Sequence, residues 1–577
     1  MNISSSAAML ALLAGTLHAG DSVDLSSGWR FRAGDDAAWS AAEFDDSEWA
    51  AIEVGKNWEE QGYAELDGYA WYRLRVTIPG DLREHDDFNL TQTLIMELGQ
   101  IDDVDETWLN GERIGGTGVF PPEYATEWRR ERAYPVAANL VRWGEENVIA
   151  VRVYDGTNGG GMWKGEPRLR VEGIADLVRI SWDEVDAVLM TDESVRVLAT
   201  VHNSSPIKLS GAVLFTVEND EGETSSTPES ERMFMPGAQL PVTGELTPPA
   251  PGFYRVTCTV RWDGGEVRSE HDKAFPYRAV AIESKLTRES DFDEFWDHTL
   301  AELAQVAPEF ELERRSELDT PTHRVYLVTM RSLGNLRVRG WYQEYRLEPS
   351  RPKPAVLRVP GYGGAMHPMD DDSAVNYFSF DPRGHGHSTD DMPGQPVDYW
   401  LRGLDDKEGY FYQGAYADCV RAVDFLASRP EVDVNRIAIT GGSQGGGLSF
   451  ATAALDSRIA LCAPDIPWLC DWRRYFSSTT WPDIESWIAA KPERTWESMH
   501  KTLSYFDVLN LVDRIECPVF VGLGLEDDVC PPATIYAVYN RLAGTKQVHT
   551  YHSEHWVPGE HQKLKREWIA KQFSVMR

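Results

Sequence analysis

One stretch decides the fold of the carboxyl-terminal half: Asn435-Arg436-Ile437-Ala438-Ile439-Thr440-Gly441-Gly442-Ser443-Gln444-Gly445-Gly446-Gly447. The apolar run 437–439 indicates a buried strand, and the residues after the glycines indicate a helix. Gly441, Ser443 and Gly445 fit the pattern G-x-S-x-G in the strand–turn–helix setting of a nucleophile elbow. Glycines flank the serine because so tight a turn leaves no room for neighbouring β-carbons. The pattern predicts Ser443 as a nucleophile; a glycine-rich turn with a capping serine is the alternative.

A serine nucleophile needs a base, and the base needs a carboxylate that orients it. In α/β-hydrolases these follow in the order Ser, acid, His, each in a loop after a strand. The strand predicted at 519–523 leads into a loop with Asp527, and a strand that ends at Tyr551 leads into a loop with His555. Both lie after Ser443, so the order is met.

Neighbouring residues compete for these roles. Glu526 and Asp528 flank Asp527, and His552 lies three residues before His555. We expect His552 to be buried support, since it lies close to the strand end. His385 and His387 have no companion carboxylates at metal-ligand spacing, so we interpret them as part of a structural loop.

An oxyanion that develops during acyl transfer needs two backbone donors. One is the amide of Gln444, directly after the nucleophile. The other is expected from the loop after the strand at 354–359, where Tyr362 lies among glycines that let the backbone approach a ligand. Trp468 is a candidate for closing a small acyl pocket, and a core aromatic residue is the alternative.

Composition limits the classes of function. The chain has 577 residues, which predicts about three or four domains, and its 42% hydrophobic content suits packed globular domains. Its 56 Lys and Arg against 92 Asp and Glu give a formal net charge of −36. Such a surface repels nucleic acid and anionic lipid, so we expect neither as a partner. We predict no metal and no cofactor.

The first twenty residues hold a short apolar run, Ala7 to Gly15, followed by Leu17-His18-Ala19. The run is too short to span a bilayer and resembles a secretory signal, although no Lys or Arg precedes it. We therefore predict a signal peptide at 1–19 and a secreted or periplasmic protein. Six cysteines without a C-x-x-C pair indicate neither a zinc site nor a disulfide scaffold, although one disulfide among the last four is left open.

Two β-regions precede the elbow. Residues 21–172 show short alternating runs with turn residues between them, which predicts an antiparallel sandwich, and Asn110-Gly111 is a hairpin signal. Residues 174–276 match a smaller immunoglobulin-like or fibronectin-like sandwich. From Ser290, a candidate helix cap, the apolar period becomes helical, and strands then alternate with helices. The fold class is therefore α/β, with an α/β-hydrolase domain at 285–577 preceded by two all-β sandwich domains.

Two resemblances extend this interpretation. The stretches DGYAWYR, DDVDETWLNGERIG and NVIAVRVYD resemble the jelly-roll, sugar-binding-like domain of family 2 glycoside hydrolases. From Phe292 onward, PGYGG, DPRGHGHS, GSQGGG, APDIPWLCDWRR and GLEDDVCPPATIYAVYN resemble the acetyl xylan esterase / cephalosporin C deacetylase family of carbohydrate esterases. The second resemblance implies Ser443 as nucleophile, Asp527 as the acid three residues before C-P-P, and Tyr362 and Gln444 as oxyanion donors. His385 stands where that family has Gln.

The expected function is a carbohydrate acetyl esterase that removes O-acetyl groups from acetylated poly- or oligosaccharides through a Ser443-His555-Asp527 acyl-enzyme mechanism. The partner is then the acetylated carbohydrate, and the oligomeric state is left open. A serine exopeptidase and an esterase for a different acyl ester remain alternatives, as does a degenerate sugar-binding module. An intact triad argues against the last.

Overall fold

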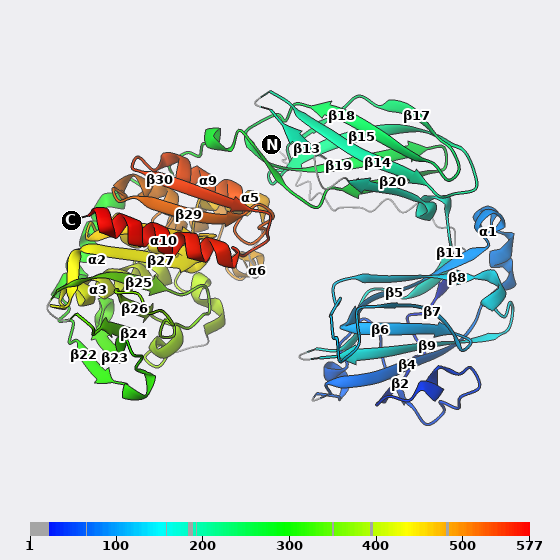
Figure 1. Cartoon of the computed structure of the whole chain (residues 1–577), viewed down its shortest axis with the longest axis horizontal. Helices are drawn as coiled ribbons and strands as arrows, with labels where there is room; N and C mark the ends of the chain where they lie inside the picture. The colour runs from blue at the N-terminus through cyan, green and yellow to red at the C-terminus, as the bar shows by residue number, and fades with distance from the viewer. Residues whose placement is uncertain are drawn as a thin grey trace.

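The computed structural model describes residues 22–576, apart from 65, 157–158, 183–187, 192, 349–350, 393–395 and 480–483. The predicted signal peptide therefore lies outside the described residues. The strands form five sheets that divide the chain into two all-β domains and one α/β domain, and no sheet of the described residues mixes strands from different domains. In Figure 1 the second β-domain connects the jelly-roll region to the α/β domain.

The front domain is a sandwich of two antiparallel sheets around one apolar core. One sheet consists of β1 (Ser22–Asp24), β11 (Arg168–Val171), β5 (Thr93–Asp102), β10 (Gly161–Lys164) and β8 (Glu131–Ala137). The other consists of β3 (Ala50–Ala51), β2 (Arg30–Ala33), β4 (Gly68–Thr77), β9 (Glu146–Asp155), β6 (Val104–Leu109) and β7 (Glu112–Thr117). Asn110 and Gly111 join β6 to β7, with φ of 52° and 89° as a primed hairpin turn requires. The short helix α1 (Asp86–Thr91) precedes β5.

The second domain is a smaller antiparallel sandwich with its own core. One sheet consists of β12 (Val178–Trp182), β14 (Val195–Asn203), β13 (Val188–Met190) and β18 (Gln239–Leu246). The other consists of β16 (Thr224–Ser226), β15 (Leu209–Asn219), β19 (Gly252–Trp262), β20 (Gly265–Glu270), β17 (Ser230–Phe234) and β21 (Phe275–Tyr277). Its alternating buried and exposed positions along β14 and β15 are those of strands with one face on the core.

The third domain is built on a nine-stranded mixed sheet, in the order β22-β23-β24-β26-β25-β27-β28-β29-β30. The strands are β22 (Glu311–Arg314), β23 (His323–Arg331), β24 (Arg337–Tyr345), β25 (Lys353–Val359), β26 (Asn376–Asp381), β27 (Val432–Gly442), β28 (Ile459–Asp465), β29 (Val519–Gly524) and β30 (Lys546–Tyr551). From β26 to β30 every pair is parallel. The antiparallel edge, β22 to β24, did not follow from the expected alternation of strands and helices, because hairpins form it before the first crossover.

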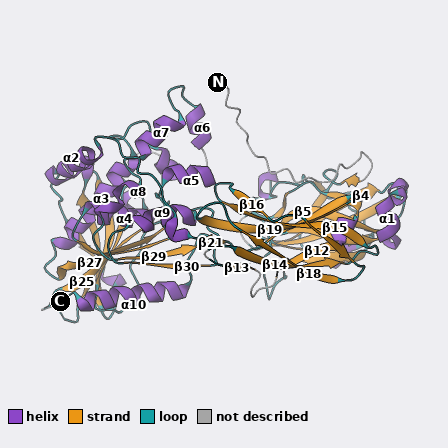
Figure 2. Ribbon diagram, turned by 90° about the horizontal axis from the view of Figure 1, so that it is seen from above, coloured by secondary structure: helices purple, strands orange, loops and turns teal. Residues whose placement is uncertain are grey.

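Helices cover both faces of this sheet. They are α2 (Phe292–Gln305), α3 (Phe411–Ala427), α4 (Gln444–Leu455), α5 (Trp472–Ser478), α6 (Ile484–Ala489), α7 (Trp496–Leu503), α8 (Val508–Leu511), α9 (Pro532–Arg541) and α10 (Gly559–Val575). Figure 2 shows α10 on the face opposite to the other helices. Ala438 and Leu461 pack with Trp568 of α10, whereas their neighbours Ile439 and Cys462 belong to the larger core on the other face. Burial on both faces explains why these strands read as continuous apolar runs.

Three sequence-based details have clear outcomes. Helix α2 begins at Phe292 with Asp291 at the N-cap position, so Ser290 as the cap was wrong. The Asp291 carboxylate instead accepts hydrogen bonds from Lys407 and Tyr505. All six cysteines are free thiols, so no disulfide joins any of the last four. Among the described residues, no helix is both long and apolar enough to cross a membrane.

Candidate active site

Ser443 lies in a strained turn between β27 and α4. Its φ of 56° and ψ of −121° fall where a residue with a side chain is rarely found, and such strain clusters at active sites. The flanking glycines are required by contact: a β-carbon on Gly441 or Gly445 would lie 2.6 or 2.5 Å from the backbone oxygen of Val359. The elbow therefore packs directly against β25, and its main chain is held by a hydrogen bond from Ser443 N to Asp465 O of 3.0 Å.

Asp527 and His555 lie in the loops after β29 and β30, and they are hydrogen-bonded to each other. His555 Nδ1 is 2.9 and 3.0 Å from the two carboxylate oxygens of Asp527. Asp527 is 3% exposed, and its Oδ1 also accepts from the backbone N–H groups of Val529 and Cys530 at 3.0 and 2.7 Å. The carboxylate is thus fixed, and it holds the His555 proton on Nδ1, which leaves Nε2 free to accept one.

The competing residues have other roles. Asp528 is exposed. Glu526 contacts His552, whose Nδ1 donates to the Glu526 carboxylate over 3.0 Å. The expectation that His552 is buried was wrong: its side chain is 51% exposed, because it points to the domain surface rather than under the sheet. The structure therefore pairs Asp527 with His555 and Glu526 with His552.

Cys530 connects the elbow to this pair. Burial raises the pKa of the Cys530 thiol, as does the charge of Asp527, while a hydrogen bond from Ser443 acts in the opposite direction. The Cys530 Sγ, one Asp527 oxygen and one His555 ring nitrogen all lie within 4.8 Å of one another. Among the hydrogen bonds of the described residues, none joins Ser443 Oγ to His555, and in unliganded hydrolases this bond is often long.

The predicted oxyanion donors border the serine. Gln444 is the first residue of α4, so its amide belongs to a helix amino terminus, where partial positive charge favours an anion. The loop with Tyr362 follows β25, and a β-carbon on its Gly361 would lie 4.0 Å from the Ser443 β-carbon. The Tyr362 ring packs edge-to-face on Trp468, with centroids 5.7 Å apart. Both donors are therefore on segments next to Ser443.

Known proteins match this part of the chain. The acetyl xylan esterase (AXE1) family matches residues 279–571, about half of the chain. The chain belongs to the acetyl xylan esterase family. Acetyl esterase Axe7A of Xylanibacter ruminicola is 29% identical over 341 residues, which cover 56% of this chain and 75% of that protein.

Solved structures of similar proteins include two further esterases. The acetyl xylan esterase from Paenibacillus sp. R4 is 33% identical with a TM-score of 0.48, and acetyl xylan esterase 1 from Thermoanaerobacterium sp. JW/SL YS485 is 26% identical with the same score. Each match covers 51% of this chain and 98% of the other. A β-glucuronidase of Bacteroides uniformis, 13% identical, is matched over 96% of this chain and 57% of its own, with a TM-score of 0.33. As a family member, this esterase is a serine carboxylic-ester hydrolase, and its mainly parallel sheet with helices on both faces is that of an α/β-hydrolase domain.

His385, in the loop after β26, anchors the side chain of the residue after the nucleophile. Its Nδ1 lies 3.1 Å from Arg383 O, and its Nε2 accepts from Gln444 Nε2 at 2.9 Å. Burial lowers the His385 pKa, which suits a neutral ring that donates at one nitrogen and accepts at the other. Tyr412 donates to Gln444 Oε1 over 2.7 Å, so the oxygen and the nitrogen of the Gln444 side-chain amide both have a partner. His387 instead packs its ring on Trp341.

Trp468 is 2% exposed and lies directly behind the serine. Its backbone N–H donates to Ser443 O over 2.9 Å, and its ring contacts Tyr362 and Tyr412 at centroid distances of 5.7 and 6.3 Å. A side chain so enclosed can shape the acyl end of a pocket but offers little surface to a sugar.

Asp465, a residue that sequence reasoning missed, supports the elbow from the end of β28. Its backbone oxygen accepts from Ser443 N, while its buried carboxylate accepts from His561 Nε2 at 2.8 Å, Gln562 Nε2 at 2.8 Å and Lys565 Nζ at 2.5 Å. Burial alone would raise the Asp465 pKa, but Lys565 and His561 outweigh it and lower the pKa. Helix α10 is thereby bonded to the end of β28, where the backbone oxygen of Asp465 accepts the hydrogen bond from Ser443 N.

Two groups of three side chains among the described residues have the spacing of metal ligands: Asp527, Cys530 and His555, and Asp102, Asp103 and Asp155. In the first group the Asp527 carboxylate and His555 Nδ1 are already hydrogen-bonded to each other, and Asp527 Oδ1 also accepts from two backbone N–H groups. His385 and His387 belong to neither group. We assign no metal to these residues.

Proposed function

We propose that this esterase removes O-acetyl groups from acetylated poly- or oligosaccharides, with Ser443, His555 and Asp527 as its catalytic triad. The observation that carries the proposal is the hydrogen-bonded pair of Asp527 and His555 in loops beside the strained Ser443 elbow. Membership of the acetyl xylan esterase family supports the acetyl ester as the bond that is cleaved.

The chemistry follows from the arrangement of these groups. His555 Nε2 accepts the hydroxyl proton of Ser443 as Oγ attacks the acetyl carbonyl carbon, and Asp527 stabilises the imidazolium that forms. The amides of Tyr362 and Gln444 donate to the oxyanion. His555 then gives the proton to the departing sugar oxygen, which leaves an acetyl group on Ser443. Water, deprotonated by His555, attacks this ester and releases acetate and the free serine.

The acyl side of the site favours a small group. Trp468 packs against both Tyr362 and Tyr412 behind the serine, and Trp468 and Tyr412 are buried, so these rings restrict the space for an acyl chain on that side. We therefore propose acetyl over longer acyl chains. No specific observation favours a serine exopeptidase.

The test is acetate release across a panel of acetylated plant and algal polysaccharides and oligosaccharides, beside synthetic esters of increasing chain length and an aminoacyl anilide. The proposal expects acetate release from saccharides, a preference for acetyl over butyryl esters, and no anilide cleavage. Ser443→Ala, measured beside the wild type, should lose at least about 10³-fold in kcat with unchanged unfolding by urea. Faster cleavage of the anilide than of any acetyl ester would overturn the assignment.

We also propose export, because an acetylated polysaccharide is met outside the cell and the run Ala7 to Gly15 resembles a signal. Fractionation of cells that express the full chain tests this: the proposal expects a mature protein that begins after the predicted segment 1–19, outside the cytoplasm.

A further inference from the structure

The second β-domain is packed onto the esterase domain through apolar and polar contacts. Phe253 of β19 lies 5.3 Å from the Tyr536 ring of α9, and both belong to the large core of the esterase domain. In the linker that follows β21, Ala279 O and Ile282 O each accept from Asn540 Nδ2 of α9 over 2.9 Å. The two domains therefore meet along α9, the helix that follows the loop with Asp527.

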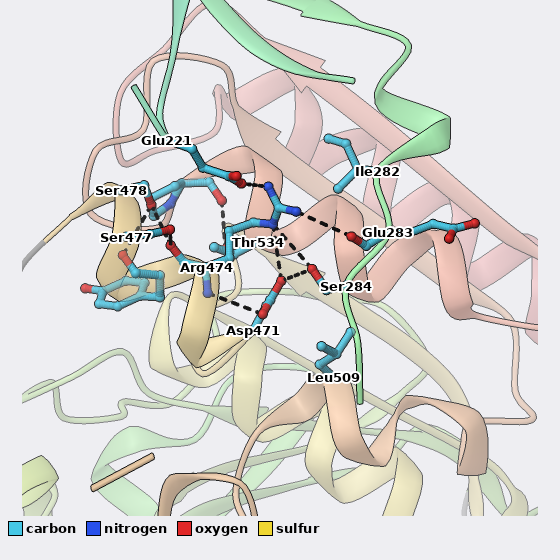
Figure 3. Close-up of polar contacts among 12 residues, drawn as sticks. Glu221, Ile282, Glu283, Ser284, Asp471, Arg474, Ser477, Ser478, Leu509 and Thr534 are labelled. Atoms are coloured by element: carbon cyan, nitrogen blue, oxygen red, sulfur yellow. Dashed lines mark hydrogen bonds and ion pairs between the residues drawn. The ribbon is translucent and has the colours of Figure 1, made fainter. Parts of the chain in front are cut away.

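A polar cluster extends this contact. Figure 3 shows Arg474 of α5 between Glu221 of the second domain, the linker residue Ser284 and Asp471. Such ion pairs and hydrogen bonds fix the orientation of one domain on the other.

One further contact reaches the active-site loops themselves. The carboxylate of Glu526 accepts a hydrogen bond of 2.8 Å from the backbone N–H of Ala274, which lies just before β21 in the second domain. The same oxygen accepts from His552 Nδ1 over 3.0 Å, and the Glu526 side chain is 11% exposed. A third bond, from Glu526 N to Ser553 O at 3.1 Å, joins the two loops through their backbones.

We propose that Glu526 is a positioning residue that couples the second β-domain to the pair Asp527 and His555. Glu526 directly precedes Asp527, and His552 precedes His555 by three residues in the same loop. One carboxylate thus holds the acid loop, the histidine loop and the second domain at a single point. Among the hydrogen bonds of the described residues, none joins Glu526 to Ser443, Tyr362 or Gln444, so we infer that it acts on the reaction through its neighbours. The inference rests on the proposed roles of Asp527 and His555.

The physical reason is the precision that catalysis needs. An error of about 1 Å in the placement of a catalytic group can cost on the order of 10²-fold in rate. The turn after β30 is only partly packed: Ser553 is buried, but the His552 side chain is 51% exposed and gains little restraint from burial. A part-buried carboxylate that accepts from both sides supplies that restraint, and the docked β-domain completes it.

The experiment compares Glu526→Ala with Asn540→Ala in the full chain. Each variant removes two side-chain hydrogen bonds: Glu526 loses those with Ala274 and His552, whereas Asn540 loses those with the linker residues Ala279 and Ile282, at the far end of α9 from Asp527. With a small aryl acetate, the proposal expects Glu526→Ala to lower kcat about tenfold with KM within about twofold, whereas Asn540→Ala leaves kcat near that of the wild type. Unfolding by urea is measured for both.

Two more variants test the coupling. His552→Ala should lower kcat less than Glu526→Ala does, and the double variant should be no slower than Glu526→Ala alone, since both changes break the same link. Glu526→Gln keeps an oxygen that can accept from the Ala274 N–H and should therefore retain most of the wild-type kcat. If Glu526→Ala does not fold, the positioning role is tested by comparing Glu526→Gln and His552→Ala with the wild type.

The outcomes separate this proposal from the proposed function. A wild type that does not hydrolyse the ester contradicts the proposed function. An active wild type with equal kcat in Glu526→Ala and Asn540→Ala overturns the positioning role, whether both are fast or both are slow. Additive losses in the double variant would also overturn it.

Discussion

Replacing Asp527 by Asn should remove most of the activity without unfolding the protein, and the contacts dictate how the new amide is oriented. Oδ1 of Asp527 accepts from two backbone N–H groups, those of Val529 and Cys530, at 3.0 and 2.7 Å. An amide oxygen must stay at this position, since an NH2 group would face two donors. The NH2 group then occupies the place of Oδ2, 2.9 Å from His555 Nδ1.

The amide oxygen, although 3.0 Å from His555 Nδ1, already accepts from two backbone N–H groups, so we expect Nδ1 to accept from the nearer NH2 group and the His555 proton to move to Nε2. That nitrogen is the one proposed to take the proton of Ser443, and the new tautomer cannot do so. The corresponding change in a Ser-His-Asp hydrolase lowers kcat by about 10⁴-fold. At about 1.36 kcal/mol for each factor of ten, the loss is about 5.5 kcal/mol of transition-state stabilisation.

The assay is the initial rate of hydrolysis of an aryl acetate near pH 7.5, with urea unfolding measured on the same preparations. Asp528→Asn is the matched control, because it changes the same side chain at an exposed neighbouring position. If Asp527→Asn kept more than about a tenth of the wild-type kcat, Asp527 would not set the tautomer of His555, and the reasoning would be refuted.

Three further predictions concern the support of the elbow. Gly445→Ala places a β-carbon 2.5 Å from a backbone oxygen of β25 and should lower the free energy of unfolding by about 1–3 kcal/mol, whereas Gly442→Ala meets open space and should not; urea unfolding distinguishes them. Lys565→Met leaves the buried carboxylate of Asp465 without its cation and should cost about 3–5 kcal/mol in the same assay; a change below about 0.5 kcal/mol would contradict the ion pair. Burial lowers the pKa of His385 in the folded state. As the pH falls, the imidazole is therefore protonated in the unfolded chain before it is protonated in the folded one. The free energy of unfolding should thus decrease as the pH drops through the unfolded pKa of about 6.5. In His385→Gln this fall between pH 7 and 5 should be smaller, and an identical pH profile would show that His385 does not contribute.

Local patterns predicted the parts of the site that depend on local chemistry. The elbow followed from Gly441, Ser443 and Gly445, because a tight strand-to-helix turn constrains those positions whatever the rest of the fold does. Asp527 and His555 followed from their places after predicted strands, since parallel strands deliver their loops to one edge of a sheet. Their pairing rests on the same rule, and the observed hydrogen bond agrees with it.

Residues that act through distant partners could not be found in this way. His385 looked like a loop histidine, because its partner Gln444 lies 59 residues further along and no periodicity connects them. Asp465 is the last residue of β28, and nothing in the sequence around it points to a partner. Its hydrogen bonds with α10 depend on how that helix packs across the sheet. A buried polar group must find partners, but the sequence does not say which. The altered R-G-H-G-H-S stretch was the one available signal for His385.

The role of Glu526 was the hardest to predict from the sequence. Its donor is a backbone N–H, 252 residues away, and a backbone group has no residue type that a pattern could reveal. Any non-proline residue at position 274 offers that N–H, so the need for a specific side chain falls on Glu526 alone. In an esterase without a second β-domain, a carboxylate here would lose this partner and keep only His552. We therefore expect an acid at this position to accompany the β-domain among family members. An alignment sorted by the presence of that domain checks this, and an acid found equally often in both groups would contradict it.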